Sequence, residues 1–496
     1  MRRKTLSAAL ILLLVWISIS LLSASSHEND SAVALIMSNF PNSSSYDVWL
    51  VDAITGEQTH IRQLHGYSSL ASWSPSGRYV TLSNKRDSDS WYLSIYDTMT
   101  DTITVVSDHV RNMNECSANF WSPDERFIAY QTPMGLYLHE YVDGNLRDPI
   151  QLIENRPRYQ RLTWSSDGRY LLFLDPQDNV VLLDLNQDVI QGNILSELEI
   201  TGLHYPRFSP DGRYLLTDIA NDNPAGNYAL IELSTRHVHN FMTDARFLRW
   251  STDSQYVAFT RGSNDHSPGL YFLHVADAEI YEVPLREDTR HGFSQLWGSG
   301  VYVTVGVGRD WVQVSTADNE TQIVLRQSEI SQYVDHFWSP DGTLLAIRTV
   351  NGDSDGSTHI HIYDVSDMRV MALVETLEIP TPPVMVVGSW MWSEDGRYLA
   401  VKGEDDVVAV DLQTGDTVAL PEDPNFEELY PQGWIDSLLA FERYSGRERE
   451  NALFVYDMQT HTVSPLIDDL NQLERFSGWQ DAPLQMGRAL PPCGSG

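Results

Sequence analysis

Cysteine is nearly absent from this sequence: Cys116 and Cys493 are the only two among 496 residues. A fold held together by a framework of disulfides is therefore excluded. The two thiols could pair in an oxidising compartment, but a core of this size needs no such link, and two unpaired thiols fit the sequence equally well.

Positive charge is scarce as well. The chain has 33 Lys and Arg residues against 68 Asp and Glu residues, a formal net charge of -35. A surface with this charge repels phosphate backbones, and no basic stripe is present to neutralise them, so nucleic-acid binding is excluded. Acidic substrates such as pectin fragments are disfavoured for the same reason.

Long apolar runs are lacking everywhere except at the N-terminus. There Arg2, Arg3 and Lys4 precede an apolar stretch over residues 6–22, which is the layout of a secretory signal. At about 17 residues the stretch reaches the lower limit of a spanning helix, so an uncleaved anchor stays open beside cleavage, which we favour. We expect residues 1–26 to be a signal peptide or signal anchor, and the rest to be secreted, periplasmic or on the cell surface.

A phrase of nine residues is repeated along the rest of the chain. It reads WSSDGRYLL at Trp164, FSPDGRYLL at Phe208, WSPDGTLLA at Trp338 and WSEDGRYLA at Trp392. Related openings occur at Trp73, Trp121 and Trp250, and weaker ones at Trp297, Trp434 and Trp479. Successive openings lie 41 to 54 residues apart, which gives a period near 44.

Each opening ends one short strand and is followed by further short extended segments separated by polar turns, four strands in each period. Four strands in a period of about 40–50 residues are typical of a propeller blade. The chain after residue 27 begins inside such a unit, and the final opening at Trp479 has only a tail after it. Merging these two fragments gives about ten units, in one ring over residues 27–486 closed by the C-terminal strand, followed by a tail over residues 487–496.

Ten units exceed the roughly 4–8 blades of ordinary propellers. One wide ring, two smaller propellers, and overcounting at Trp297 and Trp434 all remain open, and we favour one continuous ring. The segment TLEIPTPPVMVVGS before Trp390 is the best candidate for a seam between two rings.

The repeated phrase predicts a structural turn. Pro and Asp suit its central positions, and Gly can take the left-handed conformation that redirects the chain. The aromatic residue should end the preceding strand and pack between blades, while the run from Tyr170 to Phe173 should be buried on both faces. Arg169, Arg213 and Arg397 are expected to extend along the blade edge with their charges in water.

The phrase, with a downstream I-Y-D strand, resembles the repeat of TolB-like and WD-like propellers. The same repeat forms the propeller of prolyl-oligopeptidase relatives. The resemblance covers residues 32–486 and implies a β-propeller, but a fold of this kind hosts many functions.

A serine hydrolase domain is not expected. Propeller peptidases carry their nucleophile in a separate domain with a G-x-S-x-G elbow, and this chain lacks that sequence. The segment GFSQL at Gly292 differs at its last position.

The segment NGDSDGSTH resembles a calcium loop through Asn351, Asp353 and Asp355. The pattern then fails at His359 and Ile362, where a calcium loop needs an oxygen ligand and a Glu. We therefore predict a solvated hairpin there.

Histidines offer another candidate metal site. His359 and His361 lie two apart on a predicted strand, hence on one face, with His336 in the same unit; His237 and His239 form a similar pair. Such imidazoles could begin a zinc or manganese site, and propeller lyases with a central His-bound metal exist. Because a pair of histidines on the outer face of a strand needs no metal to be stable there, we favour the interpretation without a metal.

These observations favour a non-catalytic extracytoplasmic propeller that binds a protein or peptide on its top face or central funnel. We expect a monomer without catalytic residues, metal or cofactor, with no membrane contact beyond the N-terminal segment. The alternative is an extracellular carbohydrate-active enzyme, a lyase or glycosidase, that uses funnel carboxylates or the group His336, His359 and His361. A third hypothesis is a structural surface protein whose acidic face binds calcium diffusely.

Overall fold

The computed structural model describes most of the predicted ring. The residues described are 32–39, 45–65, 70–85, 91–110, 121–142, 144–154, 162–177, 179–185, 193–198, 203–219, 227–242, 245–251, 253–261, 269–282, 293–299, 302–307, 310–315, 321–326, 333–350, 358–364, 372–379, 390–402, 407–420, 428–445, 450–466 and 473–479. The predicted signal at 1–26, the predicted tail at 487–496, both cysteines, the calcium-like residues 351–357 and most of the candidate seam lie outside these residues.

The first half of the ring contains the following strands. They are β1 (Val33–Asn39), β2 (Ser45–Asp52), β3 (Gln58–His65), β4 (Leu70–Trp73), β5 (Tyr79–Lys85), β6 (Trp91–Asp97), β7 (Thr102–Val110), β8 (Phe127–Thr132), β9 (Gly135–Val142), β10 (Asn145–Leu146), β11 (Ile150–Glu154), β12 (Thr163–Trp164), β13 (Tyr170–Leu174), β14 (Val180–Asp184), β15 (Leu203–Phe208), β16 (Tyr214–Ile219), β17 (Asn227–Glu232) and β18 (His237–Met242). A short 3-10 helix, η2 (Ile194–Leu198), follows β14.

The second half continues the pattern. Its strands are β19 (Ala245–Trp250), β20 (Tyr256–Arg261), β21 (Gly269–His274), β22 (Ile280–Glu282), β23 (Phe293–Ser299), β24 (Tyr302–Val307), β25 (Asp310–Ser315), β26 (Thr321–Arg326), β27 (Tyr333–Trp338), β28 (Leu344–Val350), β29 (Thr358–Asp364), β30 (Ala372–Ile379), β31 (Trp390–Trp392), β32 (Tyr398–Lys402), β33 (Val407–Asp411), β34 (Asp416–Ala419), β35 (Glu428–Ile435), β36 (Leu438–Ser445), β37 (Glu450–Asp457), β38 (Thr462–Pro465) and β39 (Leu473–Trp479).

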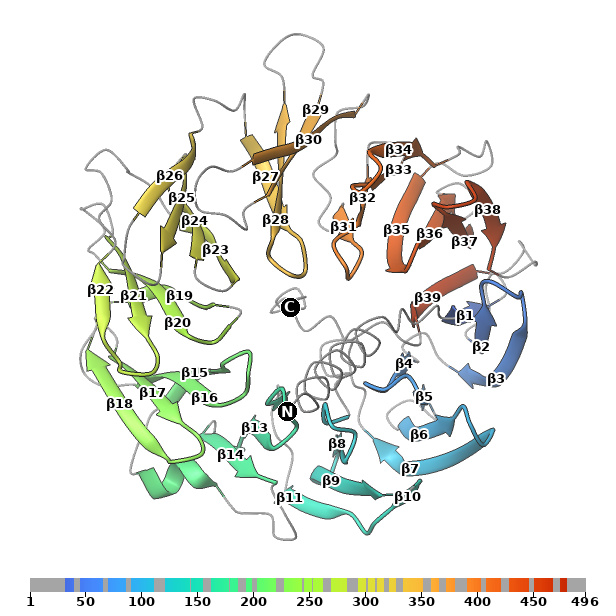
Figure 1. Ribbon diagram of the computed structural model, residues 1–496. Coiled ribbons are helices and arrows are strands. Elements are labelled where there is room, and N and C mark those ends of the chain that lie inside the picture. Colours follow the sequence, from blue (N-terminus) through green and yellow to red (C-terminus); the bar gives the residue numbers. More distant parts are fainter. Residues whose placement is uncertain are drawn as a thin grey trace, which may run out of the picture.

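These strands form ten antiparallel sheets, most of them with four strands in sequence order, such as β4-β5-β6-β7 and β31-β32-β33-β34. Figure 1 shows the sheets side by side around one centre; in sheets such as β23-β24-β25-β26 the first strand is innermost and the last lies at the outer rim. The prediction of an all-β propeller is confirmed, and the sheets follow one ring rather than two smaller propellers.

The ring closes through the two ends of the chain. Strand β39 pairs antiparallel with β1, from Ala34 opposite Trp479 to Asn39 opposite Leu473, and completes the sheet β3-β2-β1-β39. The sequence predicts this closure from its two incomplete end units. Closure matters because it pairs the inner edge of β1, which an open array would leave exposed.

The aromatic residue of the phrase ends the first strand of its sheet, as predicted. Trp164 pairs with Leu171 and Trp392 pairs with Leu399, in each case seven residues later in the sequence. This constant spacing explains the constant length of the phrase, because the turn must bring the chain back at one fixed register.

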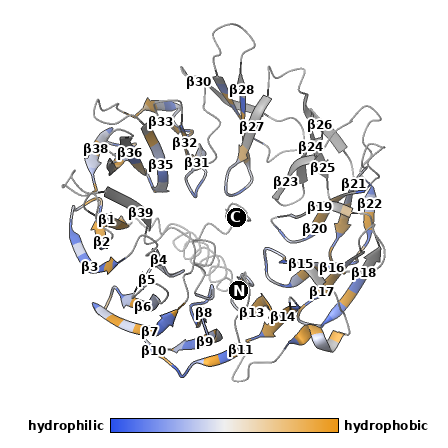
Figure 2. Cartoon of the chain, turned by 180° about the vertical axis from the view of Figure 1, so that it is seen from behind, coloured by the Kyte–Doolittle hydropathy of each residue, from blue (hydrophilic) through white to orange (hydrophobic). Residues whose placement is uncertain are grey.

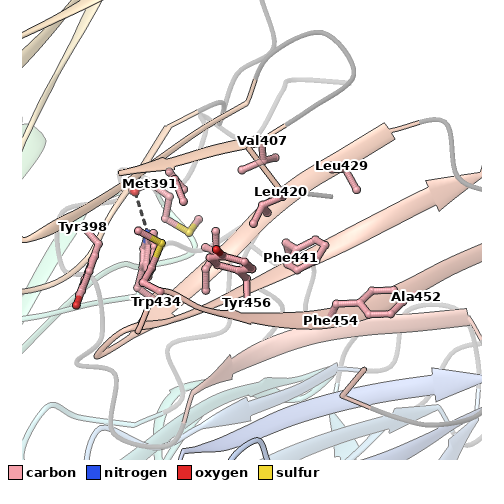
Figure 3. Packing of buried hydrophobic residues seen from close by; sticks show 14 residues of the cluster. Met391, Tyr398, Val407, Leu420, Leu429, Trp434, Phe441, Ala452, Phe454 and Tyr456 are labelled. Atoms are coloured by element: carbon pink, nitrogen blue, oxygen red, sulfur yellow. Dashed lines mark hydrogen bonds between the residues drawn. The ribbon is translucent and has the colours of Figure 1, made fainter. Parts of the chain in front are cut away.

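The core lies between neighbouring sheets. One cluster joins the sheets β31–β34 and β35–β38 through Met391, Trp434 and Phe441, and the indole N–H of Trp434 donates to the Met391 carbonyl at 3.0 Å (Figure 3). Strands β32 and β33 are buried along their whole length, whereas the outer strand β34 is mostly exposed. The predicted burial of the strand after the phrase on both faces is confirmed.

One sheet departs from the expected four strands. The sheet β12-β13-β14 has three strands among the described residues, and η2 packs beside β14. The Asn193 side chain accepts from Leu182 N–H at 3.1 Å and donates to the Val180 carbonyl at 3.4 Å. Among the described residues, the side-chain amide of Asn193 thus makes hydrogen bonds to β14 of the kind that a fourth strand makes in other sheets. The sequence did not predict these bonds.

Candidate functional site

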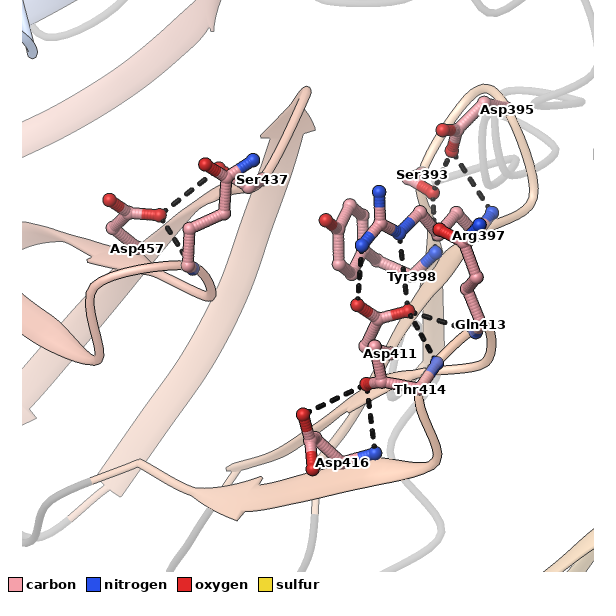
Figure 4. Close-up of polar contacts among 11 residues, drawn as sticks. Ser393, Asp395, Arg397, Tyr398, Asp411, Gln413, Thr414, Asp416, Ser437 and Asp457 are labelled. Atoms are coloured by element: carbon pink, nitrogen blue, oxygen red, sulfur yellow. Dashed lines mark hydrogen bonds and ion pairs between the residues drawn. The ribbon is translucent and has the colours of Figure 1, made fainter.

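The sequence predicts that the repeated phrase is a structural turn, and the structure shows how its serine contributes to that turn. Ser393 is buried, and its Oγ accepts from Tyr398 N–H at 2.7 Å and donates to Asp395 Oδ1 at 2.6 Å (Figure 4). The same Asp395 oxygen accepts from Arg397 N–H at 3.0 Å. Serine and aspartate therefore hold the turn closed, and the hydroxyl is committed to its own hairpin.

The same arrangement recurs around the ring. Buried serine hydroxyls donate to an aspartate two residues later at 2.5–2.6 Å in the pairs Ser122 and Asp124, Ser165 and Asp167, Ser209 and Asp211, Ser251 and Asp253, and Ser339 and Asp341. A catalytic serine needs a base to accept its proton and an exposed oxygen to attack. These hydroxyls are buried and bonded to structural carboxylates, so the repeated phrase builds the ring.

Neighbouring turns are also linked to each other. Glu125 stands where other copies of the phrase have Gly, with a φ of 56°, and its carboxylate accepts from Ser76 N–H at 2.5 Å and from Ser76 Oγ at 2.8 Å. Ser254 stands at the same place with a φ of 63° and accepts from Asp211 N–H at 2.9 Å. Where Gly is replaced, the new side chain binds the turn of the preceding unit.

The arginine that follows the turn forms an ion pair instead of extending into water. Arg397 makes two hydrogen bonds to Asp411, at 3.2 Å and 2.7 Å, and its guanidinium lies 4.8 Å from the Tyr398 ring centre (Figure 4). Arg169 binds Asp184 in the same way. The hydrogen bonds from Arg397 lower the pKa of Asp411.

The expectation that these arginines extend along the blade edge was therefore wrong for Arg169 and Arg397. In each of these two sheets the aspartate that ends the third strand, Asp184 or Asp411, is almost fully buried and binds the arginine of the same sheet. Arg213 is more exposed, and it pairs with Asp211 of its own turn.

The histidine candidates fall on the predicted strands. The rings of His359 and His361 stack 6.2 Å apart on one face of β29, and burial, with a contribution from His359, lowers the pKa of His361. His336 and His361 both pair with Ile347 of β28, so their backbones are two strand spacings apart, about 10 Å. Within the described part of the chain, no three His, Cys, Asp or Glu side chains gather as they would around a metal ion.

The second histidine pair lies at the outer rim. His237 and His239 are on β18, with ring centres 4.3 Å apart in an edge-to-face arrangement. The outer strand of a blade is remote from the centre of the ring, where propeller lyases with a His-bound metal hold that metal. The structure therefore does not bring this pair together with the histidines of β27 and β29.

One carboxyl group near the centre has a raised pKa. Burial raises the pKa of Glu394, and the neighbouring charge of Asp395 raises it further. The hairpin between β31 and β32 that carries both residues points towards the centre of the ring in Figure 1. Asp395 is bound by Ser393 and Arg397, so the two acids do not form the facing pair of carboxylates that glycoside hydrolysis uses.

Several large apolar side chains are exposed among the residues whose burial the structure describes. They are Ile54, Met99, Ile103, Val105, Met134, Ile150 and Ile280. All but Ile280 come from three successive sheets, those of β1–β3, β4–β7 and β8–β11. The exposure of these residues could not be predicted from the sequence, because alternation alone does not tell which strand of a blade is outermost.

Among the described residues, no helix is long and apolar enough to cross a membrane. The N-terminal apolar stretch lies outside those residues, and its role stays a prediction.

Neither a family model nor a curated protein matches the chain. A crystal structure of a eukaryotic initiation factor is 13% identical over 91% of this chain and 100% of its own, with a TM-score of 0.48. Dipeptidyl peptidase 4 from Porphyromonas gingivalis is 16% identical over 71% and 60%, with a TM-score of 0.44. TolB from Acinetobacter baumannii is 18% identical over 58% and 77%, with a TM-score of 0.25. Likeness at this level carries no argument about activity, and the propeller assignment rests on the sheets themselves.

Proposed function

We propose that this chain is a non-catalytic, extracytoplasmic propeller scaffold that binds a protein or peptide partner. The observation that carries the proposal is that the repeated serines and aspartates, the side chains best suited to chemistry, are committed to the turns that hold the ring together. In the turn that Figure 4 draws, the Ser393 hydroxyl donates to Asp395 and accepts from Tyr398 N–H, so both hydrogen bonds lie within one hairpin.

Two further observations support binding. A rigid ring presents loops and outer strands whose residues can vary without disturbing the core. Among the residues whose burial is described, six large apolar side chains are exposed on three successive sheets, and exposed apolar surface can mark contact with a partner. The N-terminal signal favours a site of action outside the cytoplasm.

A selection experiment tests the proposal. Protein 27–496 is immobilised and exposed to phage that display short random peptides, with heat-denatured protein as the control surface. We expect peptide families that bind the folded protein, are displaced by the same protein in solution, and dissociate with micromolar constants. Enrichment no greater than on the denatured control would contradict a peptide-binding scaffold.

The alternative is an extracellular lyase or glycosidase, and the raised pKa of Glu394 near the centre is the observation that favours it. Incubation with a panel of neutral and acidic polysaccharides separates the two functions. The scaffold predicts no new reducing ends, whereas product formation that is lost in Glu394→Gln would establish the enzyme.

A further inference from the structure

Strand β7 is the longest outer strand in the described part of the chain. It is the last strand of the sheet β4-β5-β6-β7 and pairs with β6; no other described strand pairs with it. It has 9 residues, whereas the outer strands β3 and β30 have 8 each, β34 and β38 have 4 each and β22 has 3. A long outer strand offers more backbone groups to an incoming chain than a short one does.

The backbone groups of β7 that face outward can be assigned. Thr98 N–H donates at 3.1 Å to a carbonyl on the β5 side of the sheet. Because direction alternates along a strand, Asp97 bonds towards β7, where its partner is Thr102. The N–H and C=O groups of Ile103 and Val105 therefore point away from β6, towards the rim.

The side chains of the same two residues are exposed. Ile103 is 39% exposed and Val105 is 57% exposed, and Met99 in the preceding turn is 76% exposed. Figure 2 shows hydrophobic residues on β7 at the outer edge of the ring. No charged residue occurs between Thr102 and Ser107.

Two other outer strands carry features that block pairing with another chain. Strand β38 ends at Pro465, and β3 carries Arg62 in its middle. Prolines, charges and short strands are the usual protection of sheet edges. The register shifts of the β6 and β7 pair lie beyond Val105, so the half of β7 that begins at Thr102 keeps regular pairing geometry.

The charges around β7 specify the chemistry of a partner. Asp101 precedes the strand and Asp108 lies near its end, both exposed and about 23 Å apart along an extended chain. Asp108 contacts His109 at 2.8 Å. Carboxylates at both ends of an apolar stretch complement a peptide with basic residues at its ends. A net charge of -35 opposes pairing with a second copy of this chain.

We propose that the outer edge of β7 binds an extended segment of a partner protein as an additional strand of the sheet. The segment has about six residues, with β-branched or other apolar side chains facing Ile103 and Val105 and Lys or Arg at its ends. Backbone hydrogen bonds give the affinity, and the exposed pair gives the side-chain preference. This inference rests on the proposed function, because it names the surface and the partner chemistry of the same scaffold.

The peptides selected on protein 27–496 serve as the probe, labelled with a fluorophore and titrated with protein variants. Ile103→Lys and Val105→Lys place a positive charge against the basic segment, and we expect each to weaken binding roughly tenfold or more. Ile280→Lys is the matched control, an exposed isoleucine on the short outer strand β22, and should leave binding unchanged. Melting curves check that all three variants fold.

A second readout distinguishes strand addition from an apolar contact alone. Methylation of alternate peptide nitrogens removes the donors that face β7, and one of the two alternating sets should abolish binding while the other has little effect.

Peptides that bind the β7 variants as tightly as the original protein would overturn the inference and leave the proposed function standing. If no peptide is enriched on the folded protein, both fail.

Discussion

The serine hydroxyl of the repeated turn is buried and makes two hydrogen bonds, one as acceptor and one as donor. Ser165 is fully buried, accepts from Tyr170 N–H at 2.8 Å and donates to Asp167 at 2.6 Å. A buried N–H without an acceptor costs about 1–3 kcal/mol, so the hydroxyl stabilises the hairpin by satisfying one. Serine at this place is small enough to lie inside the turn and polar enough to bind both groups.

The ion pair behind the turn predicts a pH dependence. The hydrogen bonds from Arg397 hold the pKa of Asp411 below its usual value near 4. Since the folded-state pKa is the lower one, the pair stabilises the fold above the unfolded pKa, and this contribution is lost as the pH falls through the folded pKa. Asp97 has a lowered pKa through Arg78 for the same reason.

Asp411→Asn should therefore lower the free energy of unfolding at neutral pH by on the order of 1 kcal/mol. It should also make that free energy fall less steeply below pH ~4. Urea titrations at several pH values measure both effects. A variant with the same stability at neutral pH and the same slope in acid would show that the pair contributes nothing.

At the scale of the hairpin, alanine substitutions at two glycines would distinguish the cost of backbone strain from the cost of a steric clash. Gly168 and Gly396 have nearly the same left-handed φ, 72° and 71°. A Cβ at Gly168 would lie 2.6 Å from the Asp124 carboxylate of the neighbouring sheet, whereas at Gly396 the nearest side-chain atom is 3.6 Å away. Asp124 is held by Ser122 and Arg126 N–H, so it cannot easily move aside.

Gly396→Ala should cost about 1–2 kcal/mol of folding free energy, the usual penalty of a left-handed residue with a side chain. Gly168→Ala should cost more, because the clash with Asp124 adds to the same strain. Denaturant unfolding of the two variants gives the difference directly. Equal losses would mean that the turns of neighbouring sheets are not packed as closely as the structure places them.

The sequence predicted the elements that depend on local patterns. The position of Trp164 at the end of a strand, the turn after it, and the buried strand from Tyr170 all follow from spacing and alternation. The partner of Arg169 did not follow, because Asp184 lies on another strand and meets it only once the register is fixed. The hydrogen bond from Leu182 N–H to the Asn193 side chain, beside the three described strands of that sheet, was missed for the same reason.

At the scale of the whole molecule, closure depends on one strand. Deletion of residues 473–496 removes β39 and leaves the inner edge of β1 without its partner. We expect the melting temperature to fall by roughly 10 °C or more and the truncated protein to associate through the open edge. A chain that ends after Trp479 keeps every described strand and serves as the control. Equal melting of both truncated chains would contradict closure by β39.

The location of the exposed apolar residues is also a property of the whole ring. Ile103 and Val105 alternate as in any half-buried strand, and only the order of strands from centre to rim shows that their sheet has no further strand among the described residues. Position in the ring was the information that the sequence lacked, and it is the basis for assigning recognition to the rim.

The repeated residues hold the ring together, and we propose that recognition occurs elsewhere. Ser165→Ala, Ser339→Ala and Ser393→Ala, each made separately, test this most directly, with Ser464→Ala at an exposed position of β38 as the control. Melting temperature and affinity for the selected peptides are measured on the same samples, well below the transition. We expect each serine variant to lose about 1–3 kcal/mol of unfolding free energy, and therefore to melt at a lower temperature, while its affinity for the peptides is unchanged. Unchanged melting with lost affinity would contradict it.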